Sequence, residues 1–181
     1  MINLKMTGKK NNREINEKEL MDFYGYSGKL GKIQLKLRLL KSWILHSIAF
    51  SSIHPGIIIS MQKARGVKIG NNCHFAPYVQ LDLLYPSQIS IGENVAIGSN
   101  TMIFAHINMG TNDFLKTEYP RRVMPVKIKS GAWINPGCII TAGITIGENS
   151  IVSVGSVVTN DVPDNCIVAG NPARVIKKIL H

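Results

Sequence analysis

One of the five histidines, His106, stands where a side chain can reach both solvent and a ligand. It follows Ile103 by three residues and opens a polar stretch, HINMGTNDFLKTEYPRRVMP, that interrupts a regular apolar pattern. An imidazole in such a place can take and return a proton near neutral pH. The alternative is an exposed loop histidine with no chemical role. His106 is therefore the first candidate for a catalytic base.

The other histidines and the three cysteines offer no pattern for a metal site. No HxxxH or HxxxxH pair occurs, and Cys73, Cys138 and Cys166 form no CxxC pair. A zinc site usually draws on such closely spaced ligands, and a disulfide framework needs more cysteines. The first twenty residues lack the apolar core of a signal peptide. We therefore expect no metal, and we expect the reducing cytoplasm as the location.

The apolar pattern that must position these side chains has a period of six residues. It runs from residue 69 to residue 158 in four blocks of three, and all twelve positions are apolar. The twelve residues are Ile69, Phe75, Leu81, Ile91, Ile97, Ile103, Ile128, Ile134, Ile140, Ile146, Val152 and Val158. Six residues are too few for two helices and suit one short strand plus a corner. Three such faces would make one coil of about 18 residues, so the period predicts an all-β solenoid with a three-sided core.

The repeats and the C-terminal stretch resemble the hexapeptide-repeat acyltransferases. Motifs IGNN, IGEN, IGSN and IGEN each begin with a repeated isoleucine, and GNPARVI ends the segment VKIKSGAWINPGCIITAGITIGENSIVSVGSVVTNDVPDNCIVAGNPARVI. The resemblance covers residues 67 to about 178 and implies a left-handed parallel β-helix. It also implies acetyl-CoA as acyl donor, a histidine base in the position of His106, and a donor groove between two protomers of a homotrimer.

The same resemblance assigns donor contacts to named residues. The backbone around four residues would face the pantetheine arm: Asn135, Ala142, Gly143 and Val154. Three more would lie toward the nucleotide: Thr159, Asn160 and Arg174. Asn160 stands where the family commonly has a lysine, so one phosphate contact is in doubt.

Asp82 is the candidate partner of His106. Four extra residues separate Leu81 from Ile91, and once they are set aside Asp82 lies about one coil before His106. Coil stacking would then bring the two side chains close together. Asp82 could orient the imidazole or bind a substrate hydroxyl. The alternative is a solvated corner residue.

Outside the repeats, the chain divides into an N-terminal segment, an insertion and a tail. Residues 1–66 form a basic segment. Of the chain's 21 basic side chains, 13 lie in residues 1–70, whereas only 4 of its 11 acidic side chains lie there. Residues 67–167 form the β-helix, with an inserted loop at 107–126. Residues 168–181 form a tail that we expect to end in a short helix capping the last coil.

The N-terminal segment contains an amphipathic helix. Six aliphatic residues follow helical spacing, namely Leu30, Ile33, Leu37, Leu40, Ile44 and Ile48. Lysines and an arginine lie among them. We expect this stripe to pack on the β-helix or on a neighbouring subunit, with a membrane-surface helix as the alternative. A nucleic-acid partner is not expected, because no recognition motif or aromatic stacking pattern accompanies the charge.

Together with these features, the resemblance implies an O-acetyltransferase that moves acetyl from acetyl-CoA to a hydroxyl of a sugar or saccharide precursor. No cysteine or serine neighbours His106 in the sequence to serve as a covalent nucleophile, so direct transfer is expected. The close alternative is N-acetyl transfer to an amino sugar or other amine. A non-catalytic β-helix scaffold is the alternative from another class.

Overall fold

The computed structural model describes residues 12–108 and 110–180 and consists of two compact units, Met1–Leu40 and Lys41–His181. The first unit contains α1 (Asn12–Tyr24) and the beginning of α2 (Gly28–Ser51). Within it, Lys32 pairs with Glu17 at 2.5 Å, and the Arg38 guanidinium lies 3.9 Å from the centre of the Tyr24 ring. The second unit contains the rest of α2 and all the strands.

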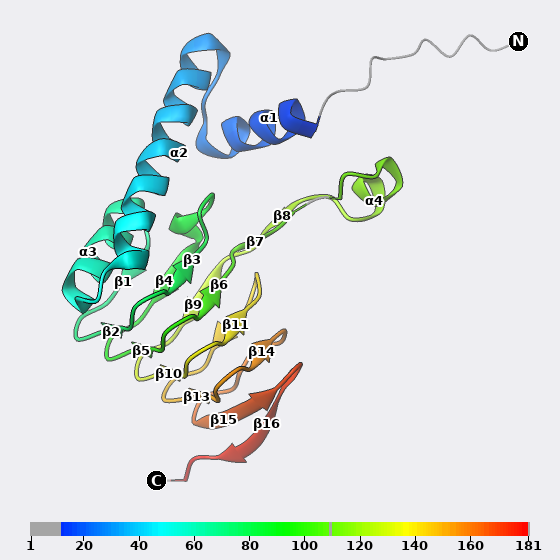
Figure 1. Cartoon of the computed structure of the whole chain (residues 1–181). Coiled ribbons are helices and arrows are strands. Elements are labelled where there is room, and N and C mark those ends of the chain that lie inside the picture. The colour runs from blue at the N-terminus through cyan, green and yellow to red at the C-terminus, as the bar shows by residue number, and fades with distance from the viewer. Residues whose placement is uncertain (1–11, 109, 181) are drawn as a thin grey trace, which may run out of the picture. The chain divides into compact units, whose positions relative to one another are not determined.

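Three parallel sheets form the second unit, and the chain visits them in turn (Figure 1). The first sheet contains β1 (Lys68–Ile69), β4 (Ile89–Ile91), β9 (Val126–Ile128) and β12 (Thr145–Ile146). The second contains β2 (His74–Phe75), β5 (Ala96–Ile97), β10 (Trp133–Ile134), β13 (Ile151–Val152), β15 (Cys166–Gly170) and the antiparallel β16 (Ala173–Lys178). The third contains β3 (Gln80–Leu81), β6 (Met102–Ile103), β11 (Ile139–Ile140) and β14 (Val157–Val158). The predicted three-sided coil is confirmed.

The six-residue period places the core side chains. Each of the twelve predicted positions is the last residue of a strand, and all except Ile69 are less than 5% exposed. Equivalent positions stack on one another: Leu81 pairs with Ile103, Ile103 with Ile140, and Ile140 with Val158. The branched side chains thus fill the interior along the whole coil.

Glycine and asparagine have separate structural roles in the IGxN motifs, which form turns between strands. A side chain on Gly98 would come within 2.4 Å of the Pro136 backbone in the next coil, so this glycine allows close stacking. The asparagine two residues later, Asn100, has a φ of 59°. Asparagine is among the few residues with a side chain that adopt this left-handed conformation readily. Close approach therefore requires the glycine, and the turn requires the asparagine.

The interruption after Ile103 forms a two-stranded ribbon that leaves the coil. β7 (His106–Ile107) pairs antiparallel with β8 (Arg122–Val123), and α4 (Asp113–Glu118) lies between them in the chain. Figure 1 shows the ribbon projecting from the coils, with α4 at its far end. His106 is thus at the root of the ribbon.

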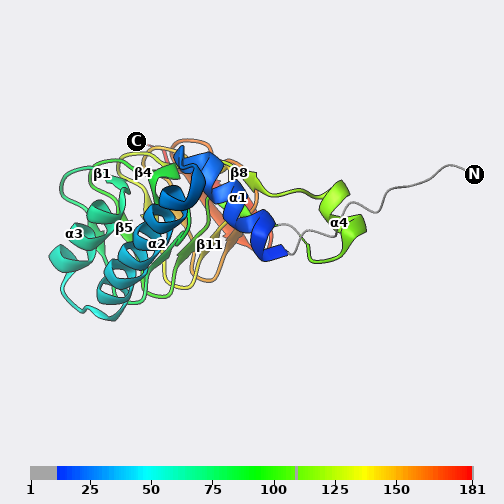
Figure 2. The same ribbon diagram turned by 90° about the horizontal axis from the view of Figure 1, so that it is seen from above.

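Helical segments cover the first coil. Helix α3 (Pro55–Arg65) packs on β1, on β2 and on the short 3₁₀ helix η1 (Pro86–Gln88). Figure 2, which looks from above, shows α3 beside this end of the coils. Ala49 and Ile58 are both 1% exposed and belong to the same hydrophobic core as the strands. The first coil therefore exposes no open apolar end here.

The predicted C-terminal helix is wrong. Residues 166–178 form the hairpin β15–β16, in which Val168 pairs with Val175. β15 continues the parallel ladder through the pair Val152 and Val168, and β16 then covers the outer edge of β15. β16 is thus the edge strand in the place where a capping helix was expected, and its exposed Arg174, Lys177 and Lys178 oppose pairing with another chain.

The predicted helix around residues 30–48 is confirmed, whereas packing of its stripe on the β-helix or on a neighbouring subunit stays a prediction. The six stripe residues Leu30, Ile33, Leu37, Leu40, Ile44 and Ile48 are 44–68% exposed. The buried side chains of α2 are instead those of Leu35, Ser42 and Ala49. In residues 12–108 and 110–180, no helix combines the length and the hydropathy needed to cross a bilayer.

Candidate active site

Asp82 and His106 meet because they follow neighbouring strands of one sheet. Leu81 of β3 pairs with Ile103 of β6, and the Asp82 backbone N–H donates to the Ile103 carbonyl at 2.9 Å. Asp82 is the next residue after β3, and His106 is the third residue after β6. The stacking predicted from the repeat therefore brings the two side chains into contact.

Four N–H donors converge on the Asp82 carboxylate, which is 1% exposed. Its Oδ2 accepts from His106 Nδ1 at 2.5 Å and from the Ala105 backbone at 2.8 Å. Its Oδ1 accepts from the Leu84 and Tyr85 backbones at 2.9 and 3.0 Å. A carboxylate offers about four lone-pair sites, so none remains for a substrate hydroxyl. The solvated-corner alternative is wrong, and this geometry favours orientation of the imidazole.

The electrostatic surroundings keep Asp82 ionised. Burial alone would raise the pKa of this carboxyl, but hydrogen bonds from His106 and from the Tyr85 and Ala105 backbones lower it below its ordinary value. An ionised carboxylate only accepts hydrogen bonds, so the shared proton lies on Nδ1 of His106. The Nε2 atom then carries the free lone pair. The His106 side chain is 10% exposed, and the arrangement suits a general base.

Most of the residues expected to contact the donor lie along one corner of the coil, the corner that follows the third sheet. Ala142 and Gly143 follow β11, and Thr159 and Asn160 follow β14. His106 follows β6 of the same sheet, so these residues occupy the same corner in successive coils. Asn135 and Val154 follow β10 and β13 of the second sheet, and therefore lie at a different corner.

Gly143 lies close to the coil that carries His106. It has a φ of 84°, and a side chain there would come within 3.3 Å of Met124. The Met124 backbone donates to the Ala105 carbonyl at 2.9 Å, one residue before His106. A donor running along this corner would thus reach the histidine at one end.

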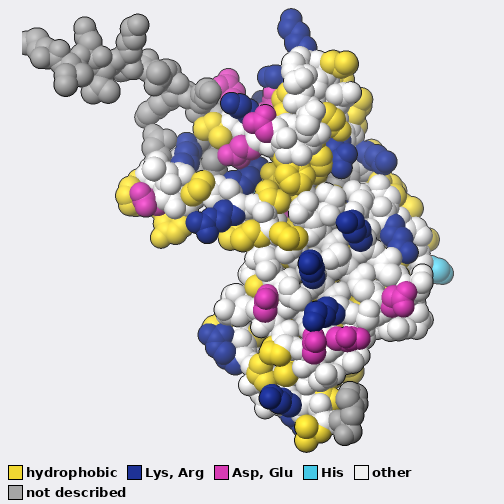
Figure 3. Space-filling view, turned by 180° about the vertical axis from the view of Figure 1, so that it is seen from behind, with side chains coloured by type: hydrophobic (Ala, Val, Ile, Leu, Met, Phe, Trp, Pro, Cys, Tyr) yellow, Lys and Arg dark blue, Asp and Glu magenta, His cyan; other side chains and the backbone are white. Residues whose placement is uncertain are grey.

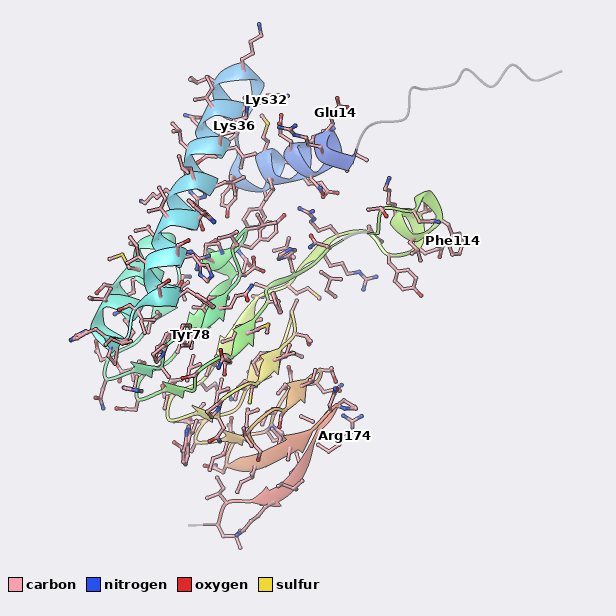
Figure 4. The ribbon with its side chains drawn as sticks, in the orientation of Figure 1. Glu14, Lys32, Lys36, Tyr78, Phe114 and Arg174 are labelled. Atoms are coloured by element: carbon pink, nitrogen blue, oxygen red, sulfur yellow. The ribbon has the colours of Figure 1, made fainter. Side chains whose placement is uncertain are left out.

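At the other end of this corner, Asn160 and Arg174 line one hollow of about 310 Å³. Asn160 accepts a hydrogen bond from Thr159 at 3.0 Å, and Arg174 is on β16 (Figure 4). Two residues expected to lie toward the nucleotide therefore share a surface depression. Arg174 is exposed, so its guanidinium can meet an anionic group.

Comparisons with known proteins agree with this arrangement. The family described as bacterial transferase hexapeptide (six repeats) matches residues 125–160. Galactoside O-acetyltransferase of Escherichia coli K12 is 30% identical over 152 residues, which cover 72% of this chain and 74% of that enzyme. The chain belongs to the hexapeptide-repeat acetyltransferases.

Other proteins of known sequence or structure are also similar to this chain. Putative acetyltransferase YvoF of Bacillus subtilis is 39% identical over 110 residues, and the chain spans 59% of its length. A solved galactoside acetyltransferase in complex with coenzyme A has a TM-score of 0.62 at 28% identity, covering 81% of this chain and 82% of that one. A maltose O-acetyltransferase from Clostridium difficile has a TM-score of 0.61 at 28% identity, covering 82% and 89%.

Sequence reasoning about this acetyltransferase missed Arg65, which supports Asp82 from behind. Arg65 ends α3 and is 5% exposed. Its Nη2 donates to the Asp82 carbonyl at 2.6 Å, and its Nε donates to Ser42 Oγ at 3.1 Å. Ser42 Oγ in turn donates to the Leu83 carbonyl at 2.9 Å. The backbone at Asp82 and at the next residue, Leu83, is thus tied to α3 and α2.

His46 completes this support as a neutral side chain. Burial, followed by the nearby Arg65 charge, lowers the pKa of His46 to about 4. Its Nδ1 lies 3.1 Å from Arg65 Nη1, and a neutral imidazole can accept there. A lone arginine in a helix gives no sequence signal for such a role, since the helix and the β-helix meet only in the fold.

Tyr85 is a second residue that the sequence did not single out. Its ring is 1% exposed, and its centre lies 5.0 Å from that of His106. Arg121, from the end of the inserted segment, donates to the Tyr85 hydroxyl at 3.3 Å. The ribbon is therefore linked to the residues that flank the imidazole. In the described part of the chain, no group of three His, Cys, Asp or Glu side chains is placed to hold a metal ion.

Arg65→Lys is expected to lower kcat about tenfold to a hundredfold while leaving the KM for acetyl-CoA nearly unchanged. Lysine keeps the charge but lacks the guanidinium fork, so the Asp82 backbone would shift and misplace the base. Steady-state kinetics of the folded variant, with Lys63→Met on the exposed side of the same helical turn as control, measure this split. Proportional changes in kcat and in the KM for acetyl-CoA would assign Arg65 a general structural role instead.

Proposed function

We propose that this chain is an O-acetyltransferase that moves acetyl from acetyl-CoA to a hydroxyl of a sugar or saccharide precursor, with His106 as general base. The observation that carries the proposal is the contact between His106 Nδ1 and Asp82 Oδ2, which leaves Nε2 free. Support for a sugar hydroxyl comes from the relatives named galactoside and maltose O-acetyltransferases. The three cysteines are free, which is compatible with the proposed cytoplasmic location.

His106 would act twice in one direct transfer. Nε2 takes the proton from the acceptor hydroxyl while the oxygen attacks the thioester carbonyl carbon. Collapse of the tetrahedral intermediate breaks the carbon–sulfur bond, and the imidazolium returns the proton to the CoA thiolate. The ionised Asp82 stabilises the imidazolium and holds the ring by Nδ1. Backbone N–H groups would stabilise the oxyanion.

Residues at the corner after the third sheet, together with Arg174 on β16, would hold the donor along its length. His106 and Gly143 lie toward the thioester, and Thr159, Asn160 and Arg174 lie toward the nucleotide. Asn135 and Val154 lie at a different corner, so one protomer cannot offer both sets to a single extended donor. This separation supports a homotrimer in which the left-handed prisms meet corner to corner. Light scattering at micromolar concentration is expected to give three times the chain mass, and an active monomer would contradict the trimer.

Arg174→Ala is expected to raise the KM for acetyl-CoA about tenfold or more with a smaller effect on kcat. A charge-assisted hydrogen bond to phosphate would be lost, and such bonds contribute about 1.5–3 kcal/mol. Raising the salt concentration should raise the same KM in the unaltered enzyme. Lys68→Ala, an exposed cation on the first coil, is the control. An unchanged KM would move the nucleotide away from Arg174.

The proposed function is tested by acetyl-CoA turnover, followed by release of free thiol against a panel of sugars, amino sugars and amino acids. O-transfer requires an alkali-labile ester in the product. Stable amide products would favour the alternative, N-acetyl transfer. No turnover together with no thermal stabilisation by CoA would favour the non-catalytic scaffold.

A further inference from the structure

Helix α2 has an apolar face that points away from the core. Along one side of α2 lie Leu30, Ile33, Leu37, Leu40, Ile44 and Ile48, each 44–68% exposed. Residues three, four or seven apart share a helix face, so these six form one continuous row, called here the α2 stripe. The stripe spans 19 residues of the 24-residue helix. The exposed area is therefore contiguous, unlike the scattered apolar residues of an ordinary surface.

The buried face of the same helix is on the opposite side. Leu35, Ser42 and Ala49 are 2%, 7% and 1% exposed, and they follow one another at intervals of seven residues. Leu37 and Ile44 each lie two residues after a member of that set. Two residues correspond to about 200° around a helix. The α2 stripe is thus not the edge of the core-facing side but a second apolar face.

The charges of α2 indicate what could cover this face. The helix GKLGKIQLKLRLLKSWILHSIAFS contains five basic residues and no acidic one. Lys29, Lys36 and Lys41 are exposed, and each adjoins a stripe residue in the sequence. Figure 3 shows yellow apolar and dark blue basic side chains side by side in the upper right of the view, where α2 runs, and Figure 4 labels Lys36 on this helix. The partner must accept aliphatic side chains and carry negative charge.

We propose that the α2 stripe docks on an anionic lipid surface. The aliphatic row would enter the boundary between headgroups and acyl chains, and the lysines would meet acidic headgroups. Trp43, 56% exposed beside the row, adds an indole ring of the kind that prefers the membrane interface. A second copy of α2 fits less well, because two faces that are each flanked by Lys29, Lys36 and Lys41 would repel one another. The helix lies on the membrane surface and does not cross the bilayer.

The test is sedimentation of the full-length protein with vesicles of phosphatidylglycerol and phosphatidylcholine, compared with phosphatidylcholine alone. Binding is expected on the anionic vesicles and should weaken as salt rises. Leu37→Gln should lower the partition coefficient about tenfold, since the buried aliphatic area is lost. Lys36→Gln should lower it about fivefold, the effect of one lysine near an anionic surface.

Matched controls distinguish binding through the α2 stripe from nonspecific effects of exposed apolar side chains and of net charge. Leu180 is 89% exposed at the other end of the chain, and Lys127 is exposed on β9. Leu180→Gln and Lys127→Gln should change the partition coefficient less than twofold. Acetyl transfer to a dissolved acceptor should be the same in all four variants, because none lies at the proposed active site.

Three results would overturn the proposal. One is equal sedimentation with neutral and anionic vesicles. Another is a partition coefficient that Leu37→Gln and Lys36→Gln leave unchanged. The third is a fall in molecular mass by light scattering for Leu37→Gln, which would make the α2 stripe a contact between copies of this chain.

Discussion

His106→Ala is expected to lower kcat by roughly 10²- to 10⁴-fold, the usual effect of removing a positioned general base. The alanine has no atom that can take the acceptor proton, and no second base is placed by the contacts around Asp82. The dissociation constant of CoA should change little, because the proposed donor contacts lie in the later coils. Thiol release gives kcat, and thermal shift with CoA gives the affinity.

His106→Asn separates loss of the base from loss of the hydrogen bond to Asp82. The asparagine amide can donate to Oδ2 from a place close to that of Nδ1, but it has no counterpart of Nε2. We expect kcat to fall as far as in the alanine variant and thermal stability to be closer to that of the unaltered protein. His74→Ala, which removes an exposed histidine of the first coil, should leave kcat unchanged. Near-normal turnover in the asparagine variant would remove His106 from the mechanism.

Asp82→Asn is expected to lower kcat by about 10²- to 10⁴-fold, because it disturbs the tautomer of the base. Four N–H groups point at the carboxylate, and an amide has one oxygen to accept them. The NH₂ group of the asparagine would face other donors. It would favour the His106 tautomer that carries the proton on Nε2, and Nε2 then cannot act as a base. The KM for the acceptor should change little, since no lone pair of Asp82 is free for a hydroxyl. A raised acceptor KM with normal kcat would assign Asp82 to acceptor binding.

The same variant should reduce the free energy of unfolding by about 3 kcal/mol at pH 7, because it leaves buried donors unsatisfied. The pKa of Asp82 is lower in the folded protein than its ordinary value of about 3.9, so the stabilising effect is complete above that pH. It is lost as pH falls through the folded value. Denaturant unfolding at pH 7 and below pH 4 should therefore show a difference between the two proteins that shrinks in acid. Asp164→Asn, at an exposed ion pair with Lys129, should have a much smaller effect at either pH.

Much of the β-helix and the contact at its centre follow from the spacing of residues in the sequence. A branched residue every sixth position can be buried on three faces only if the chain turns after each short strand, which predicts the coil and its stacking. Counting along that period placed Asp82 one coil from His106, and the two side chains form a hydrogen bond. Local spacing was enough because each coil contacts mainly the coils before and after it.

The remaining features depend on contacts that no local pattern encodes. The segment ARVIKKIL has apolar residues that fit a helix, yet residues 173–178 form β16, because the free edge of β15 offers backbone partners to a strand. In α2 the periodicity predicted a helix, but the burial of Ala49 rather than of Ile44 and Ile48 was decided by which side of the helix met the core of the strands. Arg65 reaches the Asp82 carbonyl from a separate helix. Repetition along the sequence determines the strands, whereas edges, helix faces and buried charges are decided by what the folded chain places against them.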